Sequence, residues 1–159
     1  MTKPVDKTDS NCMHTLTPHL ICADAIAAME YYKKAFNAVE EMKLLAPNGQ
    51  LVHGSMRIGD SMLMLAEECP EFGNFAPKEA NASSVYLHLM VPDVDASMKQ
   101  AEAAGAKITM PATDMFWGDR YGQLIDPFGH RWSVATHIKD MTPEEIQEAA
   151  TKACGPQAK

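Results

Sequence analysis

The sequence has little positive charge and no long apolar run, and each shortage narrows the possible functions. It carries 14 Lys and Arg against 21 Asp and Glu, for a formal net charge of −7. Nucleic acids and anionic membranes attract basic surfaces instead. No apolar run reaches the roughly 18 residues of a membrane span, and the opening residues, MTKPVDKTDSN, lack an apolar secretion signal. We therefore expect a cytoplasmic protein that binds neither nucleic acid nor membrane.

Cysteine is also scarce, and the usual catalytic signatures are missing. The four cysteines are scattered without a C-x-x-C pair, at Cys12, Cys22, Cys69 and Cys154. This spacing argues against a zinc ribbon and against a disulfide framework. The sequence contains no G-x-S-x-G, H-E-x-x-H, phosphate-loop or dinucleotide-binding motif. These absences leave the well-marked hydrolases, zinc proteases and nucleotide enzymes without support.

An internal repeat is present. The segment HLICADAIAAMEYYKKA at 19–35 aligns with HLMVPDVDASMKQAEAA at 88–104, an offset of 88 − 19 = 69 residues. The identical pairs are His19/His88, Leu20/Leu89, Asp24/Asp93, Ala27/Ala96, Met29/Met98 and Ala35/Ala104. Each copy begins with a strand-like run, followed by an Asp that suits a helix N-cap and then by an apolar stripe at helical spacing. The repeat predicts two structurally equivalent modules.

Three further strands follow each predicted helix, so each module is expected to be βαβββ. The expected strands are 17–22, 39–46, 51–58 and 61–66 in the first module, and 85–91, 107–110, 121–125 and 131–136 in the second. The predicted organisation is a flexible tail at 1–13, modules at 14–68 and 85–139, a linker at 69–84, and a C-terminal helix and tail at 140–159. A Thr142-Pro143-Glu144-Glu145 start predicts that helix. The fold class is α+β.

Several sequence blocks resemble one known superfamily. The blocks are TPHLIC…AMEYYKKAF, RIGDSMLML, FWGDRYGQLIDPFGHRWSVATH and MTPEEI. Together with the tandem repeat they resemble the vicinal oxygen chelate superfamily of glyoxalases, bleomycin-resistance proteins and extradiol dioxygenases, and within it the PhnB-like branch. The resemblance covers about residues 16–139. It implies curved sheets around a shared cavity, a small-molecule ligand and a homodimer.

The same resemblance indicates where a metal would bind. Metal-dependent members take four ligands from the first and last strands of both modules. Those positions fall on Thr17, Tyr86 and Ser133, and on Leu63 or Met64. None is a good ligand for a divalent metal, so we expect no superfamily metal site and no cofactor. The alternative is a divalent metal held by His19 and His88, with Glu67 or Glu68 as a third ligand.

The remaining candidates suit a ligand site. Phe116 and Trp117 are expected in a loop over the cavity mouth, with Gly118 and Gly122 allowing unusual backbone angles and Arg120 gripping an anionic or carbonyl group. The expected walls are His19, His88, Tyr86 and Met64. The sequence thus predicts binding of a small, partly apolar molecule.

An enzymatic function remains open. His53, on a predicted strand, could act as a general base. The alternative function is a metal-dependent or base-catalysed lyase, isomerase or dioxygenase.

Overall fold

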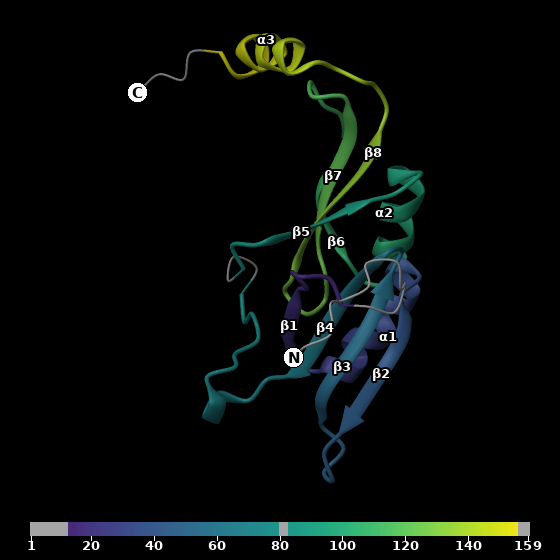
Figure 1. The fold of residues 1–159 in the computed structure, drawn as a ribbon, viewed down its shortest axis with the longest axis vertical. Helices are drawn as coiled ribbons and strands as arrows, with labels where there is room; N and C mark the ends of the chain where they lie inside the picture. Colours follow the sequence, from purple (N-terminus) through teal and green to yellow (C-terminus); the bar gives the residue numbers. More distant parts are fainter. Residues whose placement is uncertain (1–12, 80–82, 156–159) are drawn as a thin grey trace, which may run out of the picture. The chain divides into compact units, whose positions relative to one another are not determined.

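The computed structural model describes residues 13–79 and 83–155. The chain folds as two compact units, Met1–Ala82 and Ser83–Lys159 (Figure 1). Each holds one four-stranded mixed sheet with a helix packed on it, as expected for an α+β protein. The sheets are open and curved rather than closed into barrels.

The first unit contains β1 (His19–Cys22), α1 (Ala25–Phe36), β2 (Val39–Leu45), β3 (Leu51–Ile58) and β4 (Ser61–Glu67), followed by a short 3-10 turn, η1 (Pro70–Phe72). Strand order is β1-β4-β3-β2, with β1 parallel to β4 and the other neighbours antiparallel. Helix α1 covers one face of this sheet (Figure 1), and its inward side chains are buried, including Met29, Tyr32 and Phe36.

The second unit repeats this order with β5 (Tyr86–Met90), α2 (Val94–Ala103), β6 (Lys107–Asp114), β7 (Asp119–Ile125) and β8 (Arg131–His137), in a sheet ordered β5-β8-β7-β6. It ends with α3 (Pro143–Cys154), which buries no residue and starts with the predicted Thr142–Glu145 capping box. Strands β6 and β7 are longer than the sequence suggested. They extend four residues beyond 110 and two residues before 121, so Arg120 lies within a strand.

Equivalent contacts in the two units confirm the repeat. Met29 of α1 packs against Gly54 of β3, and Met98 of α2 packs against Gly122 of β7. Asp24 and Asp93 both cap their helices by accepting from the backbone N–H three residues on. Glu67 and Thr136, 69 residues apart, each accept from the first backbone N–H of a helix, at 3.1 and 2.8 Å. Local capping and packing are therefore duplicated along with the sequence.

Gly122 does not have the unusual backbone angle that the sequence suggested. The φ angle of Gly122 is not positive, whereas Gly118 has φ +99°. A Cβ at Gly122 would meet the Met98 sulfur at 2.3 Å and the Met110 carbonyl oxygen at 3.1 Å. Glycine is required there because α2 packs closely on the sheet.

We expect Gly122→Ala to lower the free energy of unfolding by about 1–3 kcal/mol, because overpacking forces Met98 and the backbone to move. Urea denaturation measures this. In the Met98→Ala background the glycine change should cost much less, since the two sites share one contact. An equal cost in both backgrounds would show that Met98 is not the obstacle.

The described residues also bear on the expectations about membrane-spanning segments and cysteines. No helix in them has both the length and the apolarity needed to cross a lipid bilayer. Cys22, Cys69 and Cys154 are free thiols, whereas Cys12 lies outside the described residues. Cys22 is completely buried, which suits a small apolar core residue.

Candidate functional site

The sheet of the second unit has two different faces. Trp132, Val134, Leu124 and Gly122 alternate onto the face packed against α2, and the three with side chains are at most 3% exposed. The intervening residues point to the opposite face, because successive side chains of a strand alternate. We call this opposite side the open face of the second sheet. It carries Tyr86, His88, Tyr121, Gln123, Arg131 and Ser133.

Four rings follow one another along the open face. Phe116 and Trp117, in the β6–β7 loop, meet edge to face with centroids 5.0 Å apart. Trp117 meets Tyr121 of β7 in the same way at 5.6 Å. Tyr121 in turn stacks on the imidazole of His88 from β5, at 6.0 Å and 21°. The row offers both ring faces and ring edges, which favour contact with another planar aromatic group.

A chain of hydrogen bonds holds part of this row in place. The Arg131 Nη1 donates to the Tyr86 hydroxyl at 3.0 Å, and that hydroxyl donates to Gln123 Oε1 at 3.2 Å. Gln123 Nε2 then donates to the Tyr121 hydroxyl at 3.1 Å. The Arg131 guanidinium also lies over the Tyr86 ring, 5.4 Å from its centroid. The bonds fix the orientation of both tyrosines and leave a cationic group beside them.

His88 is fixed by contacts on both ring nitrogens. Its Nδ1 lies 2.8 Å from Ser133 Oγ, and its Nε2 lies 3.2 Å from the Met90 sulfur. Ser133 itself is 3% exposed. The imidazole is therefore held in one orientation while one of its faces stacks on Tyr121.

The loop that carries Phe116 and Trp117 is tied to the end of β8. The Gly118 carbonyl accepts from the backbone N–H groups of Ile138 and Lys139, both at 2.9 Å. A Cβ on Gly118 would meet the Lys139 carbonyl oxygen at 2.2 Å, so only glycine fits at this positive φ. The two aromatic residues thus sit in a loop with a defined backbone.

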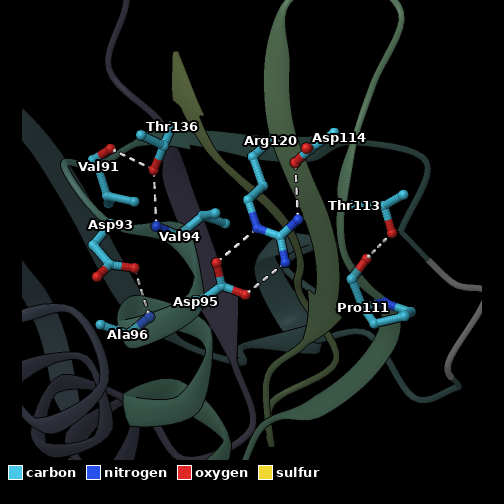
Figure 2. Close-up of polar contacts among 10 residues, drawn as sticks. All are labelled: Val91, Asp93, Val94, Asp95, Ala96, Pro111, Thr113, Asp114, Arg120 and Thr136. Carbon is cyan, nitrogen blue, oxygen red and sulfur yellow. Dashed lines mark hydrogen bonds and ion pairs between the residues drawn. The ribbon is translucent and has the colours of Figure 1, made fainter. Parts of the chain in front are cut away.

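Arg120 does not take part in the aromatic row. It pairs with Thr136 and so points to the face that carries α2. There its Nε and Nη2 bond both carboxylate oxygens of Asp95, at 2.7 and 2.9 Å, and its Nη1 bonds Asp114 at 2.8 Å. Figure 2 shows the guanidinium between the two carboxylates. The hydrogen bonds that Arg120 donates to Asp95 and Asp114 raise the pKa of Arg120, and the bond to Arg120 lowers the pKa of Asp95.

This placement corrects the expectation that Arg120 grips a ligand next to Trp117. Its donors join the first turn of α2 to the strands that flank the loop, which is a structural role. Arg131, which the sequence did not single out, is a cation on the same face as the aromatic row.

The first unit presents an equivalent open face. Its His19 imidazole meets His53 edge to face, with centroids 5.9 Å apart. Met64 is the β4 partner of His19, just as Ser133 is the β8 partner of His88. His53 precedes Gly54 as Tyr121 precedes Gly122, so the His19–His53 contact is the repeat counterpart of His88–Tyr121. Partial burial, and then the nearby His53, lower the pKa of His19.

Glu67 lies on the other face from His19. It pairs with the buried Cys22, and its carboxylate accepts from the Ala25 backbone N–H at the start of α1. Glu68 accepts instead from the Ala76 N–H at 2.8 Å. Neither carboxylate joins His19 on the open face, because each is used to hold a backbone segment.

The residues at the superfamily's ligand positions do not fit a divalent metal. Tyr86 and Ser133 have their hydroxyl groups in the contacts with Arg131, Gln123 and His88. Met64 provides a thioether, and Thr17 donates its hydroxyl to the His14 carbonyl. Zn²⁺ and its neighbours prefer imidazole, thiolate or carboxylate ligands. Within residues 13–79 and 83–155, no three His, Cys, Asp or Glu side chains form a cluster that could hold a metal ion.

Sequence reasoning missed Tyr121, Gln123 and Arg131. Each alternates with a core residue of β7 or β8, namely Gly122, Leu124 and Trp132. Strict alternation from the buried Trp132 could have found Arg131, and the repeat could have found Tyr121 as the counterpart of His53. Gln123 carried no signal beyond its position.

One ionisable contact near this loop predicts a pH effect. His137 Nδ1 lies 2.8 Å from Asp119 and its Nε2 lies 2.9 Å from Asp140. These two hydrogen bonds, with Asp119 first, raise the pKa of His137. A raised folded pKa means that the stabilisation is complete below the unfolded value of about 6.5 and is lost as pH rises through the folded value.

We therefore expect His137→Gln to destabilise the protein more at about pH 5.5 than at about pH 9. Urea denaturation of both proteins at the two pH values measures the difference. If the gap is the same at both pH values, the protonated imidazole does not contribute to stability.

The fold and the site define a class of protein with paired βαβββ units, one helix on each sheet and a ring-bearing open face. The sequence profile of the Glyoxalase/Bleomycin resistance protein/Dioxygenase superfamily matches residues 13–134, and the chain belongs to this superfamily. An uncharacterized protein of Mycobacterium bovis is 39% identical over 142 residues, which cover 87% of this chain and 93% of that protein.

Solved structures show the same fold. TioX from Micromonospora sp. ML1 aligns with a TM-score of 0.63 at 23% identity, covering 79% of this chain and 99% of TioX. A PhnB protein from Bacillus cereus aligns with a TM-score of 0.60 at 16% identity, covering 77% of this chain and 99% of that protein. At these identities the likeness concerns the fold.

Proposed function

We propose that this protein binds a small organic molecule that carries an aromatic ring and an anionic or carbonyl group, on the open face of the second sheet. The observation that supports this most is the row Phe116, Trp117, Tyr121 and His88, whose rings meet at 5.0–6.0 Å. Ligand sites are mostly apolar, with a few placed polar groups. Arg131 and the hydroxyls of Tyr86 and Tyr121 provide those polar groups.

Binding in this proposal does not use the superfamily's metal. The hydroxyl and thioether groups at the expected ligand positions are poor donors for a divalent ion, and the aromatic row needs no metal to hold a planar ring. The role is capture of a compound in the cytoplasm. We also infer membership of the PhnB-like branch, from the sequence blocks around residues 116–137 and from the fold shared with the Bacillus cereus PhnB protein.

The test uses 2-naphthoate, a planar aromatic carboxylate, with cyclohexanecarboxylate as a probe of the same charge without an aromatic ring. Calorimetric titration of the full chain should show saturable binding of 2-naphthoate and at least tenfold weaker binding of the other acid. Tyr121→Ala should weaken 2-naphthoate, because it removes the ring between Trp117 and His88.

His53→Ala is the matched control, because His53 is the repeat counterpart of Tyr121 on the first sheet. Equal loss in both variants, or no preference for the aromatic acid, would contradict the proposal.

A catalytic alternative has one observation in its favour. His19 has a lowered pKa beside His53, so a neutral imidazole is available near neutral pH to remove a proton. Base catalysis predicts deuterium uptake from D2O at the carbon next to a small ketone's carbonyl, measured by NMR, and loss of this uptake in His19→Ala. No uptake above the buffer rate would exclude this reaction for the ketone tested.

We further propose a homodimer. Val39, Met42 and Leu44 of β2 are 46–54% exposed in the single chain, and exposed apolar side chains that lie together favour contact with another surface. Light scattering at micromolar concentration should give twice the chain mass of 17.4 kDa. A mass near 17.4 kDa would contradict the dimer.

A further inference from the structure

His19 and His53 of the first unit differ from His88 and His137 of the second unit in their surroundings. His19 lies on β1 and His53 on β3, with β4 between them in the sheet. Their rings reach toward each other across the open face of that sheet, to a centroid distance of 5.9 Å. Met64 of β4, the register partner of His19, is partly exposed beside them.

The ring nitrogens of this pair have no hydrogen-bond partner within residues 13–79 and 83–155. Neither imidazole forms a hydrogen bond with another residue in the part of the chain that the structure describes. By contrast, His88 is held by Ser133 and Met90, and His137 is held by two carboxylates. Two neighbouring imidazoles without protein hydrogen bonds can turn about their side-chain torsions and present one nitrogen each to a shared partner.

The spacing suits a bridging metal ion. A metal–nitrogen bond of about 2.1 Å places the centroid of an imidazole ring about 3.2 Å from the ion. Two imidazoles that bind one ion therefore have centroids about 5.3 Å apart when the nitrogen–metal–nitrogen angle is tetrahedral. The centroids are about 6.4 Å apart when that angle is straight. The observed 5.9 Å lies between these limits.

We propose that His19 and His53 form a two-imidazole site for a divalent transition-metal ion such as Zn²⁺ or Cu²⁺, with water completing the coordination. Imidazole is a preferred ligand for both ions. The site differs from the superfamily positions at Thr17, Tyr86, Ser133 and Met64, because His53 comes from β3 rather than from a first or last strand. It also lies on the other sheet from the aromatic row, so it is independent of the ligand proposed above.

Titration of the tag-free, metal-stripped full chain with Zn²⁺ tests the proposal. We expect one equivalent to bind with a micromolar dissociation constant, because only two protein ligands are present. His19→Ala and His53→Ala should each weaken binding at least tenfold. The double variant should be no worse than either single variant, since both changes break one chelate. His88→Ala, the repeat counterpart of His19→Ala, should leave Zn²⁺ affinity unchanged.

Cu²⁺ provides a spectroscopic check that does not depend on affinity. The electron paramagnetic resonance spectrum of the one-equivalent complex should show coupling to nitrogens of two imidazoles in the wild type and of one in His53→Ala. Circular dichroism checks that each variant is folded. Zn²⁺ binding that is unchanged in the double variant, or that depends on His88 rather than on His53, would overturn the proposal. So would wild-type affinity no higher than that of the double variant.

Discussion

Trp132→Ala should lower the free energy of unfolding by about 3–5 kcal/mol, the usual cost of deleting a large buried aromatic side chain. Trp132 is 3% exposed and lies on the face of β8 that packs against α2. Its indole N–H also donates to Asp126 at 2.9 Å. Asp126, 4% exposed, accepts two more hydrogen bonds, from the backbone N–H groups of Phe128 and His130. The substitution therefore empties the core and weakens the support of the 126–129 turn.

Urea denaturation followed by circular dichroism measures this loss. Trp132→Phe is the matched variant, because it keeps most of the ring volume but removes the donor to Asp126. It should cost about 1–3 kcal/mol, the range for leaving a buried acceptor short of a partner. Trp117 is partly exposed. If Trp132→Ala lowers the free energy of unfolding no more than Trp117→Ala does, Trp132 is not a core residue.

Trp117→Ala should have the opposite profile. We expect it to weaken 2-naphthoate binding by roughly 1–3 kcal/mol, or about 5- to 150-fold, because it removes the ring that links Phe116 to Tyr121. Its free energy of unfolding should change much less than that of Trp132→Ala, because the side chain keeps solvent contact in the native state. Calorimetric titration and urea denaturation of the same preparations measure both quantities.

Phe72→Ala is a suitable control for Trp117→Ala. Phe72 is 81% exposed on the 3-10 turn η1 of the first unit, so its loss removes an aromatic ring without touching the open face of the second sheet. Binding of 2-naphthoate should be unchanged in this variant. If Trp117→Ala unfolds the protein as severely as Trp132→Ala and leaves the residual affinity unchanged, the 115–118 loop is packing rather than a ligand contact.

The repeat places different side chains at equivalent positions on the two open faces. The same backbone frame places His19 beside His53 in one unit and His88 beside Tyr121 in the other. The first pair has no hydrogen bonds among the described residues, whereas the second is joined to Ser133 and, through Gln123, to Tyr86 and Arg131. One backbone frame therefore carries two different sets of groups: two imidazoles without hydrogen bonds to the described residues, and a hydrogen-bonded ring surface.

Much of the fold could be predicted from the sequence because its signals are local. An Asp before an apolar helical stripe is enough to start the helix of each βαβββ unit, and Asp24 and Asp93 do cap α1 and α2. The turn at 126–129 follows from its Asp, Pro and Gly residues. The offset of 69 residues between the copies was sufficient to predict two equivalent units, as the contacts of Met29 and Met98 confirm. In each case the causes lie within a few residues of their effect.

The faces of the strands were decided only by the tertiary structure. A side chain's face depends on the register in which its strand pairs with its neighbours, and a register shift of one residue moves it to the opposite side of the sheet. Strand β7 begins at Asp119 rather than at residue 121, and β6 contains irregularities between Ile108 and Thr113. Arg120 therefore belongs to the pleat and faces Asp95, not Trp117. Likewise, Glu67 pairs with Cys22 and serves the start of α1, although its carboxylate alone suggested a metal ligand.

The sequence by itself determined the repeat, the helix starts, the turns and the superfamily, because each depends on residue types at short and regular spacing. Only the tertiary structure brought Tyr86, Gln123 and Tyr121 into one hydrogen-bonded chain, and His19 beside His53. The Tyr86–Gln123 and His19–His53 contacts join different strands, and their geometry depends on register, bulges and the space left by neighbouring side chains. The composition of a single strand cannot specify them, because the partner strand decides which groups meet.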